Sequence, residues 1–157
     1  MLAAELAALY ERDLIRLSQQ IAAFPDTASL WRTLPGVANS AGNLALHLEG
    51  NLREYIGRQL GGVDYTRQRP LEFSQTGLTA DDLLSRIHHT RQVVTPVIAG
   101  LSPEALDGIF PEPVLGTPIT SRQFLVHLNG HLNYHLGQID YLRRALTGAG
   151  AIALAGL

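Results

Sequence analysis

The stretch TSRQFLVHLNGHLNYHLGQIDYLRRAL, residues 120–146, decides the fold of this chain. It opens with a capping box, because Thr120 is followed three residues later by Gln123. Apolar residues then recur on one side of a helix, at Phe124, Leu128, Ile139 and Leu142. The cap and the period together predict an amphipathic helix over residues 120–146.

Three histidines of this stretch follow the same helical period. His127, His131 and His135 are spaced i, i+4, i+8, which places them within about 80° of arc on an ideal helix. Gln138 lies on the same stripe, so we expect all three imidazoles to point into the protein. Two imidazoles at i and i+4 can present ring nitrogens to one cation, about 2.0–2.1 Å from each. A hydrogen-bonded pair within the core is the alternative interpretation of His131 and His135.

Three further helices are predicted by apolar stripes of the same period, over residues 2–23, 40–60 and 80–100. The second begins at Ser40, a residue type that caps helices well, and Gly61 and Gly62 follow its end. The third begins at Thr79, with Asp82 three residues on in a variant of the capping box.

No stretch shows the sustained alternation of apolar and polar residues that is typical of a sheet. Residues 113–119 are a candidate for a short extended segment. The sequence therefore predicts an all-α fold, a four-helix bundle with long connecting loops, each over a dozen residues. Residues 1–147 are expected to form the one domain, and residues 148–157 an apolar tail able to dock on a partner molecule.

A third metal ligand has to come from another helix, and His47 is the good candidate. It lies at the edge of the apolar arc of the second helix, in a polar stripe with Asn51. His88 and His89 fall outside the apolar arc of the third helix and are expected at the surface. Four ligands on two helices would crowd one ion, so we expect His127 to support the site rather than bind the metal.

Competing metal motifs are missing from the sequence. The zincin motif fails because no Glu follows His131 directly, and no glutamate is followed three residues later by His, as in di-iron bundles. A mononuclear three-His site remains, with a coordination position open to water or substrate. Imidazole ligands suit zinc, nickel, copper and iron alike, so the residues leave the metal open.

Composition removes several other kinds of chemistry. All twelve basic residues are arginine and cysteine is absent, which excludes lysine and cysteine nucleophiles and disulfides. A net charge of −2 argues against a general nucleic-acid binder. The longest uncharged apolar stretch, residues 147–157, is far short of the ~20 residues of a membrane span. The N-terminus lacks a basic leader region, so we expect a cytoplasmic protein.

Two segments resemble one known family. Residues 124–139 resemble the last helix of the DinB/YfiT-like metalloenzymes, whose hallmark is His-x-x-x-His-x-Gly-Gln-Ile, here His131 to Ile139. Residues 39–53 resemble the family's second helix with its lone ligand histidine, and residues 67–73 a loop of one uncharacterised branch. Tyr134 stands where many members have a second histidine.

The resemblance implies a four-helix bundle, often a homodimer, in which His47, His131 and His135 bind a divalent metal ion. It favours zinc or nickel, with iron as a further candidate. Relatives include transferases and isomerases that use low-molecular-weight thiols such as bacillithiol, mycothiol or glutathione. We therefore expect a small-molecule substrate and a thiol cosubstrate. A metal-dependent hydrolase and a non-catalytic metal- or ligand-binding stress-response protein are the alternatives, and a cavity over the metal centre would favour an enzyme.

Four other polar residues are candidates for the surroundings of the metal. Asp13 lies in the apolar face of the first helix, either as an acceptor for a ligand imidazole or in an ion pair with an arginine. Gln138 either hydrogen-bonds a bound water or substrate or packs at a helix contact. Arg67 and Arg69 either bind an anionic substrate or tie down their loop through Glu72.

Overall fold

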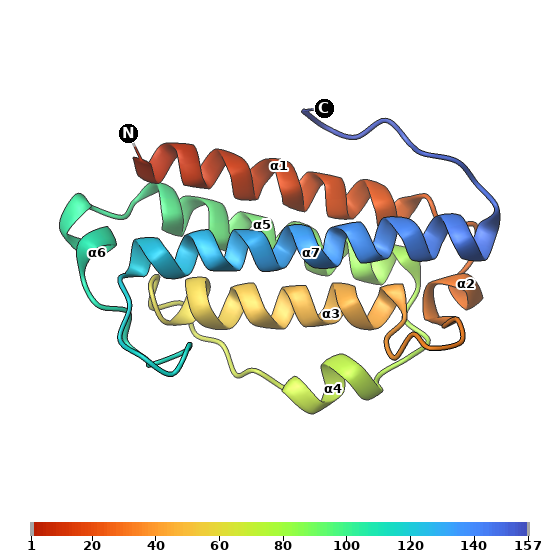
Figure 1. Cartoon of the computed structure of the whole chain (residues 1–157), viewed down its shortest axis with the longest axis horizontal. Coiled ribbons are helices and arrows are strands. Elements are labelled where there is room, and N and C mark those ends of the chain that lie inside the picture. Colours follow the sequence, from red (N-terminus) through yellow and green to blue (C-terminus); the bar gives the residue numbers. More distant parts are fainter. Residues whose placement is uncertain (1, 157) are drawn as a thin grey trace.

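The computed structural model describes residues 2–156 and is an all-α bundle (Figure 1). Its four long helices are α1 (Leu2–Ala22), α3 (Ala41–Leu52), α5 (Ala80–Ala99) and α7 (Ser121–Thr147). A π-helical segment, η1 (Arg53–Arg58), continues α3. Short helices lie in the connections, namely α2 (Thr27–Trp31), α4 (Arg69–Ser74) and α6 (Pro103–Asp107). The predicted four-helix bundle is confirmed.

Local caps explain why the long helices begin where the sequence predicts. The Ser40 hydroxyl accepts a hydrogen bond from the backbone N–H of Asn43 at 3.2 Å. Thr79 and Asp82 form a complete capping box. The Thr120 hydroxyl accepts from the backbone N–H of Gln123 at 3.1 Å. Each cap satisfies a backbone donor that the first turn of a helix leaves unpaired.

The predicted extended segment, Pro113 to Ile119, is a loop rather than a strand. Within residues 2–156 the only β-type pairing is an isolated antiparallel bridge between Ile109 and Thr120. In this bridge Phe110 donates its N–H to the carbonyl of Ile119 at 2.9 Å. The two ends of the connection between α6 and α7 are thereby pinned together at the start of α7.

The core lies between the four long helices. Helix α1 packs on α5 and α7, and α3 packs on the same two helices from the other side (Figure 1). Fully buried aliphatic residues come from every long helix, for example Leu14, Leu48, Ile98 and Leu125. Apolar burial of this kind stabilises a helix bundle far more than intrinsic helix propensity does.

All twelve residues of α3 are buried, an unusual state for a helix in a four-helix bundle. The reason is α4, which lies against the side of α3 that faces away from the bundle core (Figure 1). The polar residues Asn43, His47, Glu49 and Asn51 are therefore enclosed rather than exposed to solvent. This second cover places His47 in a protected site.

The C-terminal tail folds back along α1 (Figure 1). Gly148, in the left-handed conformation at φ 71°, ends α7. The backbone N–H of Ala155 donates to Gln19 Oε1 at 2.9 Å, and the Ala155 carbonyl accepts from Arg16 Nε at 2.7 Å. The tail thus docks on its own chain. The sequence had suggested a partner molecule as the docking surface. Across residues 2–156, no helix combines the length and apolarity needed to cross a bilayer.

Candidate metal centre

Three imidazoles meet between α3 and α7. His47 Nε2 lies 3.2 Å from His131 Nε2, which lies 3.1 Å from His135 Nε2. One ligand atom from each residue lies within 4.8 Å of the other two. Tetrahedral zinc with bonds of 2.0–2.1 Å separates its nitrogen ligands by about 3.3–3.4 Å. The three Nε2 atoms are therefore spaced almost as a single ion requires.

Two of the three imidazoles have an acceptor at their other nitrogen. His47 Nδ1 lies 2.8 Å from Glu72 Oε2, and His135 Nδ1 lies 2.6 Å from Gln138 Oε1. A glutamate oxygen and an amide oxygen accept, so both Nδ1 atoms carry the proton. In the neutral imidazoles both Nε2 atoms then present lone pairs to His131, the arrangement seen in metal-bound histidines.

This proton arrangement favours a cation at the centre over a hydrogen-bonded cluster. His131 Nε2 contacts both lone-pair nitrogens, yet it can carry only one hydrogen, so at least one close nitrogen pair would have no proton between its atoms. His131 Nδ1 is buried and has no hydrogen-bond partner among residues 2–156. An ion at the three Nε2 atoms would remove the lone-pair contact, and the residues present therefore fit a divalent metal.

Burial keeps the imidazoles of His131 and His135 neutral. Burial first, and then the neighbouring imidazoles, lower the pKa of His131 to about 4. Burial also lowers the pKa of His135. Glu72 behaves in the opposite sense: burial favours its protonated form, but hydrogen bonds from His47 and Arg67 outweigh this and lower its pKa. At neutral pH His131 and His135 are ready to bind metal and Glu72 is ionised.

Two residues allow Glu72 of α4 to contact His47. Gly50 leaves space for the carboxylate, and Arg67 pairs with it. Gly50 lies directly under the carboxylate, and a Cβ atom at this position would come within 2.8 Å of the Glu72 carboxyl carbon. Arg67 donates to both carboxylate oxygens, at 2.6 and 2.9 Å. The predicted tie between Arg67 and Glu72 is present, whereas the contact between Glu72 and His47 was not predictable from a local pattern. Phe73 adds a ring 5.0 Å from the His47 ring.

Two cavities reach the imidazole cluster from different sides. The polar cavity, about 350 Å³, is lined by His47 and His131 together with Asn51, Arg69 and His127. The apolar cavity, about 650 Å³, is lined by the connection between α2 and α3 and by the C-terminal half of α7, including His135 and Gln138. Each cavity thus offers room for a small molecule beside at least one of the three histidines.

His127 differs from its prediction. It is exposed to solvent, with its ring stacked at 6.0 Å on Phe124, rather than pointing into the bundle. One residue along a helix is a rotation of 100°, so His127 lies well away from the buried Leu128 and outside the rim occupied by His131. It lines the polar cavity and makes no close contact with the imidazole cluster.

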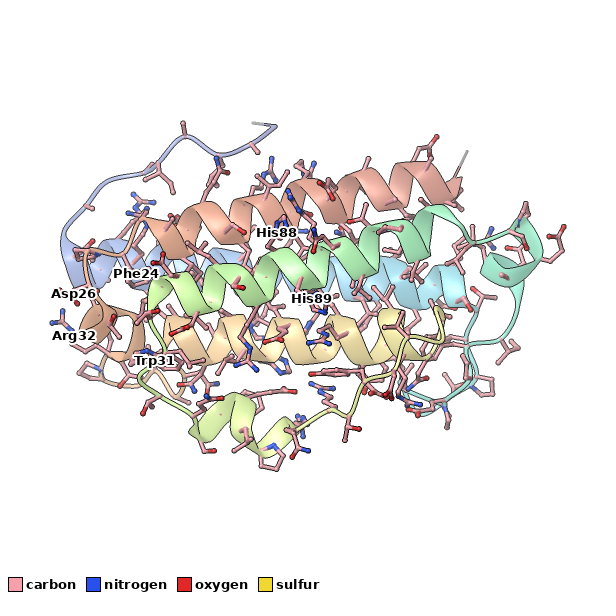
Figure 2. The ribbon with its side chains drawn as sticks, turned by 180° about the vertical axis from the view of Figure 1, so that it is seen from behind. Phe24, Asp26, Trp31, Arg32, His88 and His89 are labelled. Atoms are coloured by element: carbon pink, nitrogen blue, oxygen red, sulfur yellow. The ribbon has the colours of Figure 1, made fainter. Side chains whose placement is uncertain are left out.

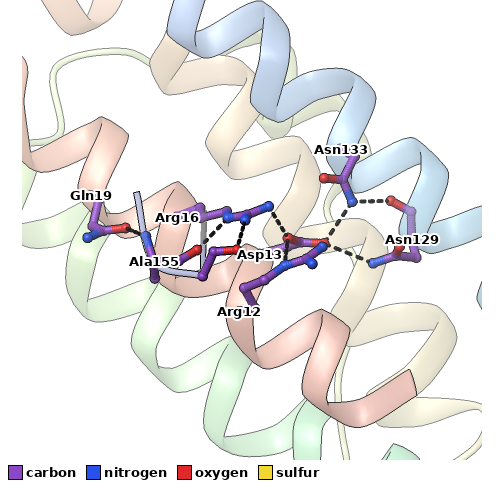
Figure 3. A network of polar contacts seen from close by, with 8 residues as sticks. Arg12, Asp13, Arg16, Gln19, Asn129, Asn133 and Ala155 are labelled. Carbon is purple, nitrogen blue, oxygen red and sulfur yellow. Dashed lines mark hydrogen bonds and ion pairs between the residues drawn. The ribbon is translucent and has the colours of Figure 1, made fainter. Parts of the chain in front are cut away.

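Asp13 is fully buried at a different place in the bundle (Figure 3). Its carboxylate accepts from Arg12 at 2.8 Å and from Arg16 at 3.2 Å. The side-chain amides of Asn129 and Asn133, on α7, donate to it at 3.2 and 2.7 Å. Arginine pairing is therefore the alternative that the structure supports, and within residues 2–156 this carboxylate has no imidazole partner.

The two remaining histidines lie apart from the centre. His88 and His89 are exposed side chains on α5 (Figure 2). Their predicted surface position is confirmed. The candidate centre consequently draws on one histidine of α3 and two of α7, supported by one residue of α4.

The fold and the site together define a four-helix bundle with a candidate three-histidine metal centre. The family model of the DinB superfamily matches residues 9–139, and the chain belongs to this superfamily. A crystal structure of a DinB-like protein from Bacillus cereus has a similar fold, with a TM-score of 0.70 and 16% sequence identity. The likeness covers 94% of this chain and 95% of the other. No curated protein sequence matches the chain.

Proposed function

We propose that this protein is a metal-dependent enzyme that transfers a low-molecular-weight thiol to an electrophilic small molecule. The observation that supports an enzyme is the pair of cavities that reach the imidazole cluster. A metal that only fixes a fold is enclosed by its ligands, whereas a catalytic metal keeps a position open to small molecules.

The proposed work of the chain is to hold and orient the metal. His47, His131 and His135 supply Nε2 atoms, while Glu72 and Gln138 fix two of the rings through Nδ1. Neutral ligands leave a zinc or nickel ion, or alternatively iron, with its full charge, and such an ion would lower the pKa of a thiol near it.

The carboxylates of the chain favour a thiol over water as the nucleophile. None of them lines either cavity in the part of the chain that the structure describes. Glu72 is held by His47 and Arg67, and Glu49 on α3 is paired with Arg86 at 2.9 Å. Hydrolysis would call for a general base to activate water. A thiol, whose pKa starts near 8.5 rather than 15.7, needs much less help to ionise.

The first experiment is elemental analysis of protein purified without a histidine tag. We expect a stoichiometric divalent ion in the wild type and in the matched control His88→Ala, and its loss in His131→Ala. His88 is exposed and lies outside the cluster, so its removal changes the histidine count without touching the proposed ligands. Full metal content in His131→Ala would overturn the ligand assignment.

The second experiment offers an electrophile to the metal-loaded protein with and without bacillithiol, mycothiol or glutathione. We expect turnover that needs both a thiol and His47, and therefore no turnover by His47→Ala. Turnover that needs His47 but no thiol would make the protein a hydrolase. Metal binding without turnover in any condition would leave a metal-binding protein without this catalytic role.

We also propose a cytoplasmic homodimer that acts on a small molecule, the pairing being what the family resemblance implies. The net charge of −2 argues against nucleic-acid binding. Because the tail docks on α1 of its own chain, the dimer contact is proposed elsewhere on the bundle. Light scattering at micromolar concentration tests this proposal, and the mass of a single chain would overturn it.

A further inference from the structure

Arg69 differs from the other arginines of the chain. Eleven of the twelve arginine side chains form an ion pair or a hydrogen bond, and Arg69 forms neither within residues 2–156. Its guanidinium carbon lies 5.8 Å from the centroid of the Phe73 ring, which leaves the donors free. Arg67, two residues earlier, is already neutralised by Glu72. Of the two arginines, Arg69 is therefore the one available to a ligand.

Arg69 lines two neighbouring cavities, of which one also holds Glu54 and Glu112, whereas the polar cavity has no carboxylate in its lining among residues 2–156. It lines the polar cavity with His47, His131 and the exposed His127, and Arg67 borders the same space. No carboxylate lines this cavity in the described chain. Because the Arg69 guanidinium faces no carboxylate within this cavity, the cavity favours an anionic ligand. A guanidinium also matches the geometry of a carboxylate or phosphate group.

Asn51 offers a hydrogen-bond donor to the same cavity. Its side chain lines the same cavity and is only 7% exposed, and neither atom of its amide has a hydrogen-bond partner in residues 2–156. The amide oxygen is the fully buried end, which leaves the nitrogen, a donor, as the end that meets the cavity.

We propose that the polar cavity binds the anionic group, a carboxylate or a phosphate, of the small molecule that this site uses, with Arg69 as the ionic partner and Asn51 as a hydrogen-bond donor. The inference rests on the proposed function, since the same cavity borders His47 and His131. A ligand with an anion at one end and a thiol at the other would then reach both Arg69 and the imidazole cluster.

Calorimetric titration of the zinc-loaded protein tests this pairing. The probes are 2-mercaptoacetate, 3-mercaptopropionate and 4-mercaptobutyrate, each compared with its neutral amide. For the chain length that spans the cavity best, we expect the acid to bind about tenfold more tightly than the amide, the usual effect of a charge-assisted hydrogen bond. Arg69→Gln should abolish the preference and Asn51→Asp should reverse it.

Arg122→Gln is the matched control. Arg122 is an exposed arginine at the start of α7, paired with Asp107 away from the polar cavity. This variant loses the same charge from the protein and should keep the preference of the wild type for the acid. Equal binding of acid and amide by the wild type, or a preference that survives Arg69→Gln, would overturn the anion site.

A metal-independent measurement separates this proposal from the proposed function. In the His131→Ala variant, the side-chain Nε–H signal of Arg69 is followed by nitrogen-15 NMR during titration with acetate and with inorganic phosphate. A saturable shift for either anion supports the site even if the protein binds no metal, and the stronger of the two identifies the preferred group. A signal that responds to neither anion would refute the role of Arg69.

Discussion

Replacing Glu72 by glutamine tests whether α4 tunes the metal centre. The carboxylate accepts from His47 Nδ1 at 2.8 Å and from Arg67 at 2.6 and 2.9 Å, and it is 5% exposed. Loss of such a partner of a ligand histidine typically lowers metal affinity 10- to 100-fold, or about 1.4–2.7 kcal/mol. Arg67 also loses its anionic partner, which should lower the free energy of unfolding by about 1–3 kcal/mol.

Zinc affinity is measured by competition with a chromophoric chelator at pH 7.5, and stability by urea unfolding with and without zinc. Glu49→Gln is the matched control, because Glu49 is equally buried on α3 and is paired with Arg53 and Arg86 rather than with an imidazole. Both variants should lose stability, and only Glu72→Gln should lose zinc affinity. Equal zinc affinities in the two variants would refute the argument that Glu72 acts through His47.

Three further predictions concern Gly50, the protonation of His131, and Asp13. Gly50→Ala should displace the Glu72 carboxylate and lower zinc affinity in the chelator assay, whereas Gly130→Ala, with open space around its Cβ, should leave affinity unchanged and raise stability by about 0.5–1 kcal/mol. The pKa of His131 is about 4 in the folded chain against about 6.5 unfolded, so between these values the unfolded chain binds more protons. Stability of the metal-free protein should therefore fall as the pH drops from 6.5 to 4, by about 1–2 kcal/mol after allowance for partial exposure, and less so in His131→Gln. Asp13→Asn should lower the urea-unfolding free energy by about 1–3 kcal/mol without changing zinc affinity, and a change in affinity would place Asp13 in the metal site.

The long helices were predictable because their signals are local. Periodic apolar residues and caps such as Ser40 and Thr79 act within a few residues of the helix they start, and the observed bounds of α1, α5 and α7 lie within one residue of the predictions. Helix α4 was missed because six residues beginning Arg69-Pro70 hold too few turns for a period to emerge. Its position depends on packing against α3, which no local pattern contains.

The candidate site also contains residues that local patterns predict and residues that only tertiary packing brings together. The spacing of His131 and His135 puts both on one helix face, and the polar stripe around His47 indicated the third residue. The contact between Glu72 and His47 joins positions 25 residues apart and requires α4 to be in place, so the sequence pattern indicated only Arg67 as a partner of Glu72. The position of His127 was wrong because the arc of about 80° reached past the rim of the core.

The placement of protons connects the fold to the proposed chemistry. Metal ligation needs neutral imidazoles with free Nε2 lone pairs, and acceptors at Nδ1 fix this arrangement for His47 and His135. Helix α7 supplies one acceptor within itself, Gln138, three residues after His135. Helix α3 has no such residue for His47, and α4 brings Glu72 from the loop, with Gly50 leaving the space and Arg67 holding the charge. A short helix with little intrinsic stability is thereby tied to the core through the centre itself, so metal binding should protect α4 from hydrogen exchange more than it protects α5.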